Sequence, residues 1–383
     1  MANDSTDLSP QLNPNLSKVA FAFRGYNATN LGRTAEFLVH DKYGPVIEEY
    51  LKRGTRICAD VTGRKVDLVD RVRRGREMTL RSYAEAVALI VSVEVAQVEL
   101  LKKFFGIDFR TGSMSFGYSL GEIAALIAGG VSPLEDALAI PLALAKDSVS
   151  LAKDVTLGVL FSSGPELSFD EVQKQCLLIN QEGNGVIGVS TYLTPNSALL
   201  LGQSDTIDRF KRRISKVLPK KVYLRKNDLR WPPLHTPIVW QRNIPNRAAV
   251  LMHTMADGFT VPQPPVVSMV TGTASYNGVN IRDTLGRWVD HPQLMWDVVY
   301  KTLVDGIEQV VHVGPEPNII PATFHRLADN VDTQTEGSIR MRALSGIVRR
   351  PWLSALLPDR TALLRAPHVK HIILEDWLLG QNV

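Results

Sequence analysis

The sequence has 383 residues, of which 45% are hydrophobic, and a formal net charge of +4. This length permits two or three domains, or one large domain with an insertion, and a sizeable core. The charge is too small for a nucleic-acid-binding surface, no apolar run is long enough to span a membrane, and the polar first residues contain no secretion signal. The two cysteines stand outside any metal-ligand spacing, so we expect a cytoplasmic protein without a metal site.

The chain begins with polar residues and then changes to an α/β pattern. Residues 1–17, rich in Ser, Asn, Asp and Pro, are expected to form a disordered or draped tail. The apolar residues 19–23 predict a buried strand, and the turn 24–29 is rich in small and polar residues. Such a turn suits backbone amides that face a ligand, although a plain loop is the alternative. Apolar residues at helical spacing predict helices over 36–52 and 80–105.

The motif Phe116-Gly117-Tyr118-Ser119-Leu120-Gly121-Glu122 lies between a predicted strand, 111–116, and an alanine-rich helical pattern. Ser119 therefore lies on a strand-to-helix turn, where glycines two positions before and after it allow a tight bend that exposes the hydroxyl. The amide of Leu120, at the helix start, would face an oxygen bound beside Ser119 and supply half of an oxyanion hole. We predict a nucleophile here, with an inert turn as the alternative.

The next part of the chain indicates an inserted unit. A helix predicted over 133–153 contains Pro141, which we expect to kink it. Residues 156–224 then follow the order β-α-β-β-α-β, which is that of a ferredoxin-like unit. We therefore predict a small subdomain inserted into a large α/β domain formed by residues 18–155 and 225–333. The large domain should resemble an α/β-hydrolase, with a mostly parallel sheet.

Prolines surround one histidine, in the segment Trp231-Pro232-Pro233-Leu234-His235-Thr236-Pro237. They hold the backbone extended or turned, so the imidazole of His235 has a fixed orientation. His253, His312 and His325 have no such setting and no paired ligand spacing. We expect those three to be packed or surface histidines.

The remainder of the chain continues the α/β pattern and then changes again. It predicts strands over 266–271 and 309–313 and helices over 247–255, 281–289 and 296–303. Residues 334–383 look like a C-terminal extension, and basic residues far outnumber acidic ones between 340 and 370. This extension is either a solvated basic face wrapped on the domain or a docking surface for an acidic partner.

Together these motifs resemble the malonyl-CoA:acyl-carrier-protein transacylases and the related acyltransferase domains of polyketide synthases. The resemblance covers about residues 18–330, and the segment after 333 has no counterpart in it. The matching pieces are Phe23-x-Gly25 with Gly32, Gly117-Tyr118-Ser119-Leu120-Gly121-Glu122, Leu234-His235-Thr236-Pro237, Trp296 and Val313-Gly314-Pro315.

The resemblance implies an acyl-CoA:acyl-carrier-protein S-acyltransferase of fatty-acid or polyketide synthesis, with no bound cofactor. Ser119 would attack the thioester of an acyl-CoA, with His235 as general base, and the phosphopantetheine thiol of an acyl carrier protein would then take the acyl group. The second oxyanion-hole amide of this family matches Tyr26. The backbone carbonyl that orients the histidine is assigned to His291, from the position of Pro292.

One departure from the family concerns the acyl group. Leu144 stands where malonyl-transferring relatives carry an arginine that pairs with the free carboxylate. A leucine cannot pair with this charge, so we expect malonyl to be a poor substrate and a neutral acyl group to be preferred. Lys146, or an arginine from elsewhere in the fold, is the alternative source of charge. Leu234 and Tyr118, which also differ from common family residues, complete the predicted acyl-binding set.

Two other functions stay open at this point. The same Ser119 and His235 would serve a thioester hydrolase that uses water as acceptor and clears acyl groups from a carrier protein. Alternatively, the chain is a non-catalytic scaffold of a fatty-acid or polyketide assembly, with the missing arginine as a sign of a decaying site. The identity of the acyl group, the role of the C-terminal extension and the oligomeric state do not follow from the sequence.

Overall fold

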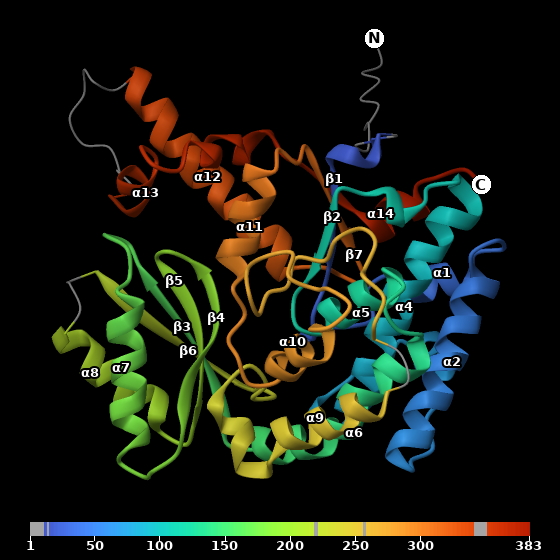
Figure 1. Cartoon of the computed structure of the whole chain (residues 1–383), viewed down its shortest axis with the longest axis horizontal. Helices are drawn as coiled ribbons and strands as arrows, with labels where there is room; N and C mark the ends of the chain where they lie inside the picture. The colour runs from blue at the N-terminus through green and yellow to red at the C-terminus, as the bar shows by residue number, and fades with distance from the viewer. Residues whose placement is uncertain (1–10, 14, 218–220, 256–257, 341–350) are drawn as a thin grey trace.

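The computed structural model describes residues 11–13, 15–217, 221–255, 258–340 and 351–383. Two four-stranded sheets organise the described chain (Figure 1). Sheet A is parallel, with strand order β2-β1-β7-β8, and sheet B is antiparallel, with order β4-β5-β3-β6. The predicted fold class is therefore confirmed, because a parallel α/β unit carries an inserted unit with ferredoxin-like strand order.

Sheet A forms the centre of the large subdomain. Its strands are β1 (Val19–Phe23), β2 (Met114–Gly117), β7 (Gln309–Val313) and β8 (Lys370–Ile373). The register places Phe23 level with Gly117 on one side and with Val313 on the other. The carboxyl ends of these three strands therefore meet at one edge, which is where ligands bind in open parallel sheets.

Alternate residues of β1 point to opposite faces of sheet A, and helices cover both faces. Phe21 and Phe23 pack into the apolar cluster on the first face, and Ala20 and Ala22 into the cluster on the second. The helices on the first face are α2 (Gly44–Thr62), α4 (Tyr83–Phe105), α5 (Leu120–Ala128) and α6 (Leu134–Ala152). Those on the second face are α11 (Met295–Val304) and α12 (Ile319–Arg340). Burial on both faces explains why β1 is a continuous apolar run.

Sheet B forms the small subdomain. Its strands are β3 (Val155–Ser162), β4 (Ile187–Thr194), β5 (Ser197–Gln203) and β6 (Val222–Arg230). The helices α7 (Phe169–Asn180) and α8 (Thr206–Val217) cover its outer face, on the left in Figure 1. Its inner face shares an apolar cluster with Phe116 of sheet A and with α11. The two subdomains therefore pack directly on each other.

The predicted strand over 266–271 is wrong. This segment is irregular and meets β2 at a single bridge, between Ser115 and Val266. Val267 and Met269 are fully buried there without joining a sheet, so their apolar character reflects packing against neighbours. The remaining helices are α1 (Thr34–Val39), α3 (Leu68–Arg73), α9 (Ile244–Thr254), α10 (Ile281–Trp288), α13 (Pro351–Leu356) and α14 (Leu374–Leu379).

The chain beyond 333 belongs partly to the large subdomain. Residue 334 lies inside α12, and β8 extends sheet A by pairing in parallel with β7. Glu375 of α14 accepts hydrogen bonds from the main-chain N–H of Glu316 at 2.8 Å and of Arg33 at 3.0 Å. The helix α14 therefore holds the turn that follows β7. No helix in the described part of the chain is long and apolar enough to cross a membrane.

Both predicted terminal segments lie partly outside the described residues. In the predicted tail, residues 1–10 and 14 are outside, while Leu12 and Leu16 pack in the core. In the basic segment, residues 341–350 are outside. Of its described members, Arg360 lies over the ring of Tyr300 on α11, 5.0 Å from the ring centroid, and Arg365 donates to Leu303 O at 2.8 Å. These two arginines bind their segment to α11.

Candidate active site

Ser119 stands between β2 and α5, on a strand-to-helix turn. Its φ is +54° and its ψ is −114°, a backbone conformation that costs free energy in a residue other than glycine. Close approach of the chain to itself requires glycine on both sides of it. A β-carbon on Gly117 would lie 2.0 Å from the carbonyl carbon of Gly121, and one on Gly121 would lie 2.3 Å from Phe23 O. Ser119 itself is half-buried, so the residue is not sealed in the core.

His235 lies beside Ser119 in the folded chain. Its Nε2 is 2.8 Å from Ser119 Oγ, and its Nδ1 is 2.7 Å from the main-chain oxygen of Trp288. The main-chain N–H of His235 donates to Val289 O at 2.8 Å. Because a carbonyl oxygen can only accept, Nδ1 carries the ring proton and Nε2 is free to accept the proton of the serine hydroxyl.

The surroundings of His235 keep its imidazole neutral. Burial lowers the pKa of His235 to about 4, although the hydrogen bond to Trp288 O acts in the opposite direction. The groups that contact the ring are uncharged: the Ser119 hydroxyl, the carbonyl and indole of Trp288, and the carboxamide of Gln293. At neutral pH the imidazole is therefore in the form that can accept a proton at Nε2.

The assignment of the orienting carbonyl to His291 is wrong, because Trp288 supplies it. The helix α10 ends at Trp288, and the last carbonyl oxygens of a helix accept no hydrogen bond from the helix itself. The carbonyl at this helix end points instead to His235. The ring of His291 contacts the carboxylate of Asp290, 2.6 Å from its Nδ1. Counting residues from Pro292 does not reveal where α10 ends, and it therefore assigned the carbonyl to a residue too far along the chain.

Two residues that the sequence analysis did not identify touch both Ser119 and His235. Trp288 accepts from His235 through its carbonyl and donates from its indole Nε1 to Ser119 O at 3.0 Å. Gln293 Oε1 accepts from the Ser119 N–H at 3.2 Å, and Gln293 Nε2 lies 3.3 Å from His235 Nδ1. Both come from the end of α10 and the segment between α10 and α11. Neither residue belongs to a motif with recognisable spacing, so only the folded chain reveals them.

The two backbone amides predicted to form an oxyanion hole, those of Leu120 and Tyr26, belong to segments that meet at the turn. Leu120 is the first residue of α5, so its amide has no acceptor within the helix. Gly25, which precedes Tyr26, packs directly on the turn, since a β-carbon on it would lie 2.6 Å from Tyr118 O and 3.3 Å from Ser119 Cβ. Glycine at this position therefore brings the first turn of the chain against the serine.

The buried guanidinium of Arg24 holds the turn that contains Gly25. Arg24 Nε donates to Gly25 O at 2.8 Å. Its terminal nitrogens donate to Thr29 O and Asn30 Oδ1, each at 3.1 Å, and to Pro315 O. These acceptors come from the turn itself and from the turn after β7. One side chain therefore joins the ends of β1 and β7 beside the serine.

The predicted acyl-binding residues are mainly apolar. Leu144 and Leu234 are 1% and 6% exposed and belong to the apolar cluster that also includes Trp288. The hydroxyl of Tyr118 lies 2.9 Å from Thr191 Oγ1 on β4, so the tyrosine before the serine contacts the small subdomain.

The cations Lys146 and Arg247 lie on or near α6. Lys146 is exposed, and two positions along a helix from Leu144 it faces a different direction. It lines a surface hollow of about 630 Å³ together with Arg64 and Arg81. Arg247 forms an ion pair with Asp147. The charges near this part of α6 are therefore either exposed or already paired.

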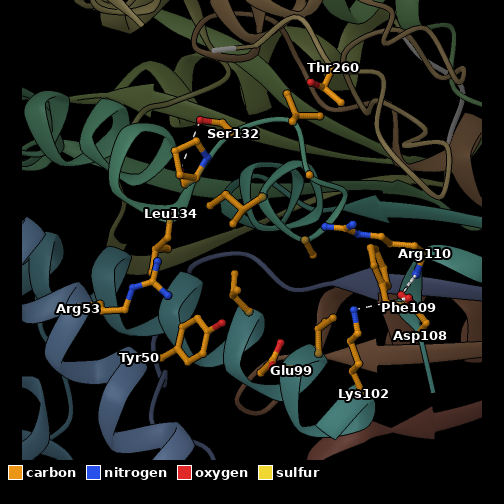
Figure 2. A pocket seen from close by; sticks show the side chains of 17 residues that line it. Tyr50, Arg53, Glu99, Lys102, Asp108, Phe109, Arg110, Ser132, Leu134 and Thr260 are labelled. Atoms are coloured by element: carbon orange, nitrogen blue, oxygen red, sulfur yellow. Dashed lines mark hydrogen bonds and ion pairs between the residues drawn. The ribbon is translucent and has the colours of Figure 1, made fainter. Parts of the chain in front are cut away.

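A separate hollow of about 470 Å³ lies between α2, α4 and the turn after α5 (Figure 2). Its lining includes residues 127–128 and 130–134, at the opposite end of α5 from Ser119. Charged side chains in and around it form pairs, Arg53 with Glu135 at 2.9 Å and Lys102 with Asp108 at 3.7 Å. We assign the candidate active site to Ser119 and His235 because, among the described residues, a hydroxyl and a neutral imidazole meet on a strained turn only there.

Comparison with known proteins identifies one group of similar enzymes. A curated malonyl CoA-acyl carrier protein transacylase of Bacillus subtilis is 20% identical over 257 residues, which is 67% of this chain and 60% of that protein. FabD of Acinetobacter baumannii has a TM-score of 0.64 at 17% identity and covers 92% of this chain and 99% of its own. The malonyl-CoA:acyl carrier protein transacylase of Xanthomonas oryzae also has a TM-score of 0.64, at 22% identity, and covers 80% of this chain and 90% of its own.

A third solved structure, with a TM-score of 0.61 and 19% identity, is of a type II polyketide-synthase acyl-carrier protein in complex with its malonyl-transacylase. No model of a known protein family matches the chain. The resemblance stated from the sequence is confirmed, since these similar proteins are malonyl-CoA:acyl-carrier-protein transacylases. At such identities the structural likeness shows the fold. The match to the curated relative spans about 60% of the length of that protein.

Proposed function

We propose that this chain is an acyl-CoA:acyl-carrier-protein S-acyltransferase that works through an acyl-serine at Ser119. The observation that carries the proposal is the 2.8 Å contact between Ser119 Oγ and His235 Nε2 on a strand-to-helix turn. The names of similar proteins support it, because they are malonyl-CoA:acyl-carrier-protein transacylases and one was solved with a carrier protein.

In the first half-reaction the Ser119 hydroxyl attacks the carbonyl carbon of the acyl-CoA thioester. The hydroxyl proton passes to His235 Nε2, and the carbonyl oxygen, now negative, accepts hydrogen bonds from the amides of Leu120 and Tyr26. The tetrahedral intermediate then collapses, the carbon–sulfur bond breaks, and the CoA thiolate takes the proton from His235. The products are acyl-serine and free CoA.

In the second half-reaction the phosphopantetheine thiol of the carrier protein takes the place of CoA. Its proton passes to His235 Nε2 while the sulfur attacks the carbonyl carbon of the acyl-serine. The Ser119 oxygen then leaves and recovers the proton from His235, so the free hydroxyl is restored. A single imidazole nitrogen therefore handles the proton in every step.

The carbonyl of Trp288 keeps the other ring proton on His235 Nδ1 throughout. In many serine enzymes a carboxylate holds this position and stabilises the transient imidazolium. An uncharged carbonyl stabilises it less, and this agrees with burial lowering the pKa of His235 to about 4. A thioester suits such a base because a thiolate leaves the tetrahedral intermediate more readily than an amine does.

We propose further that the transferred acyl group is neutral. A malonyl carboxylate beside the buried Leu144 would lose its hydration without gaining a cation, at a cost of several kcal/mol. An alkyl chain in the same place would gain about 0.8 kcal/mol for each buried methylene. The exposed Lys146 and the paired Arg247 do not supply the missing charge.

Intact-mass spectrometry after exposure to acetyl-, butyryl- and malonyl-CoA tests the proposal. We expect the wild-type chain to gain one butyryl group quickly and a malonyl group slowly, and the Ser119→Ala variant to gain neither. The His235→Ala variant should be acylated at least 10²-fold more slowly, because it lacks the general base. Addition of a phosphopantetheinylated acyl carrier protein should remove the acyl group from Ser119 and load it on the carrier.

Three results would change the assignment. Rapid release of free acid in the absence of carrier protein would indicate a hydrolase. A chain that binds the carrier but never forms an adduct at Ser119 would be a scaffold. Acylation by malonyl-CoA as fast as by butyryl-CoA would refute the preference for a neutral group.

A further inference from the structure

Gln293 is a fully buried polar residue in the short segment between α10 and α11. Its Oε1 accepts from the Ser119 N–H at 3.2 Å, and its Nε2 lies 3.3 Å from His235 Nδ1. In this orientation the carboxamide oxygen is the group that accepts from the Ser119 N–H, while the N–H₂ lies beside Nδ1, which is also a donor. Since Nδ1 already donates to Trp288 O, the Nε2 contact is one of packing.

The main chain of Gln293 is bound to the small subdomain. Its N–H donates to Ser190 O at 2.8 Å, and its carbonyl accepts from the N–H of Tyr192 at 2.9 Å. These bonds form a parallel bridge with Thr191 of β4, an edge strand of sheet B. The side chain that reaches Ser119 therefore starts from a backbone that the small subdomain holds in place.

Ser119 needs such support because its φ of +54° is unfavourable for serine. A strained backbone persists only where surrounding contacts determine it. Gln293 engages the Ser119 N–H, and the indole of Trp288 engages Ser119 O at 3.0 Å. Both sides of the strained residue are therefore held from the α10 to α11 segment.

We infer that Gln293 is a positioning residue, which holds Ser119 with its hydroxyl on His235 Nε2 and ties that geometry to β4 of the small subdomain. The inference rests on the proposed function, in which Ser119 is the nucleophile. Gln293 reaches the reaction only through Ser119 and His235, so it should influence the rate of acylation and not the affinity for acyl-CoA.

The variant Gln293→Met tests the loss of the hydrogen bond. It keeps the approximate volume of the side chain but leaves the Ser119 N–H without its acceptor. A displacement of the hydroxyl by about 1 Å lowers rates by about 10²-fold, so we expect acylation to slow by 10- to 100-fold with an unchanged KM for acyl-CoA. The matched control is Gln309→Met, because Gln309 is also buried and hydrogen-bonded, to Asn13 N and Gln11 O, at the opposite end of sheet A.

The variant Gln293→Glu tests the position beside the imidazole. A carboxylate there can still accept from Ser119 N–H, and its charge lies next to His235 Nδ1–H, which favours the protonated imidazole. The groups that now contact the ring are uncharged, and the nearby carboxylate of Asp290 is bound to Trp240 Nε1 at 2.9 Å and to His291. We expect the pKa of His235, followed by NMR, to rise by at least one pH unit in this variant.

The inference is refuted if Gln293→Met is acylated as fast as Gln309→Met, or if Gln293→Glu leaves the titration of His235 unchanged. If Gln293→Met and Gln309→Met change KM and stability by the same amounts, the role of Gln293 is merely structural. These results are separate from the proposed function. If no acyl-CoA labels the wild-type chain, the function fails, while the NMR titration and the reaction of Ser119 with a fluorophosphonate still decide the role of Gln293.

Discussion

The substitution Gly25→Ala should slow acylation of Ser119 by about 10²- to 10³-fold. The added β-carbon would lie 2.6 Å from Tyr118 O and 2.8 Å from Tyr118 Cδ1. Carbon atoms pack without repulsion at about 3.5 Å or more, so the turn must retreat by roughly 0.5–1 Å. The amide of Tyr26 retreats with it, and the loss of one oxyanion donor costs about 2.7–4 kcal/mol in the transition state.

Rapid-quench mass spectrometry of acyl-Ser119, over a range of butyryl-CoA concentrations, measures this effect. The rate constant should fall while the KM stays nearly constant, because the oxyanion forms only in the transition state. The control is Gly286→Ala in α10, where no atom lies within 4 Å of the added carbon and alanine should stabilise the helix by about 0.5–1 kcal/mol. A folded Gly25→Ala protein that is acylated at the wild-type rate would show that the Tyr26 amide does not bind the oxyanion.

Four further predictions concern charge and protonation. Because burial lowers the pKa of His235 to about 4, the acylation rate should stay level from pH 8 to about pH 5 and fall towards pH 4, and a fall centred near pH 6.5 in stopped-flow experiments would contradict this. The neutral, buried His235 stabilises the fold fully above pH 6.5, and this contribution should decline towards pH 4 by about 1.4 kcal/mol per pH unit in urea titrations. Leu144→Arg should raise the ratio of malonyl to butyryl acylation at least tenfold. It should also lower Tm, since a buried arginine is unfavourable until a carboxylate pairs with it. An unchanged ratio in competition assays would show that the acyl group does not lie beside Leu144. Burial raises the pKa of Glu122 to about 7, so the contribution of this residue to stability is complete below pH 4.5 and lost as the pH rises through 7. Glu122→Gln should remove this part of the dependence of the unfolding free energy on pH. An identical pH dependence in the variant would refute the role of Glu122.

The sequence predicted the two subdomains because hydrophobic periodicity is a local property. Alternating and helical patterns located the ferredoxin-like unit and the strands β1, β2 and β7 within a few residues. The same reasoning failed for 266–271, where buried side chains come from an irregular segment. It also missed β8, a four-residue strand whose partner β7 lies far away in the chain. Periodicity reports burial, and it cannot report which distant strand completes a sheet.

Prediction of the site had the same limit. Ser119 and His235 were identifiable because glycines and prolines next to them constrain the local backbone. The structure brings them within 2.8 Å, while their catalytic roles stay predictions. The carbonyl of Trp288 and the carboxamide of Gln293 were not identifiable, since their directions depend on where α10 ends and on a bridge to β4. Such contacts arise from packing between elements and leave no local pattern.

The hydrogen bonds made by α14 mean that the site is completed only late in the synthesis of the chain. Glu375 binds the main chain of Glu316, the adjacent Pro315 O accepts from Arg24, and Arg24 holds Gly25 next to the serine. A nascent chain would already contain the serine and the histidine long before residue 375 has been synthesised. The turn that contains Gly25 would still lack the support that Glu375 gives through the turn after β7. Premature termination ahead of α14 should therefore yield a polypeptide with both reactive side chains but little activity.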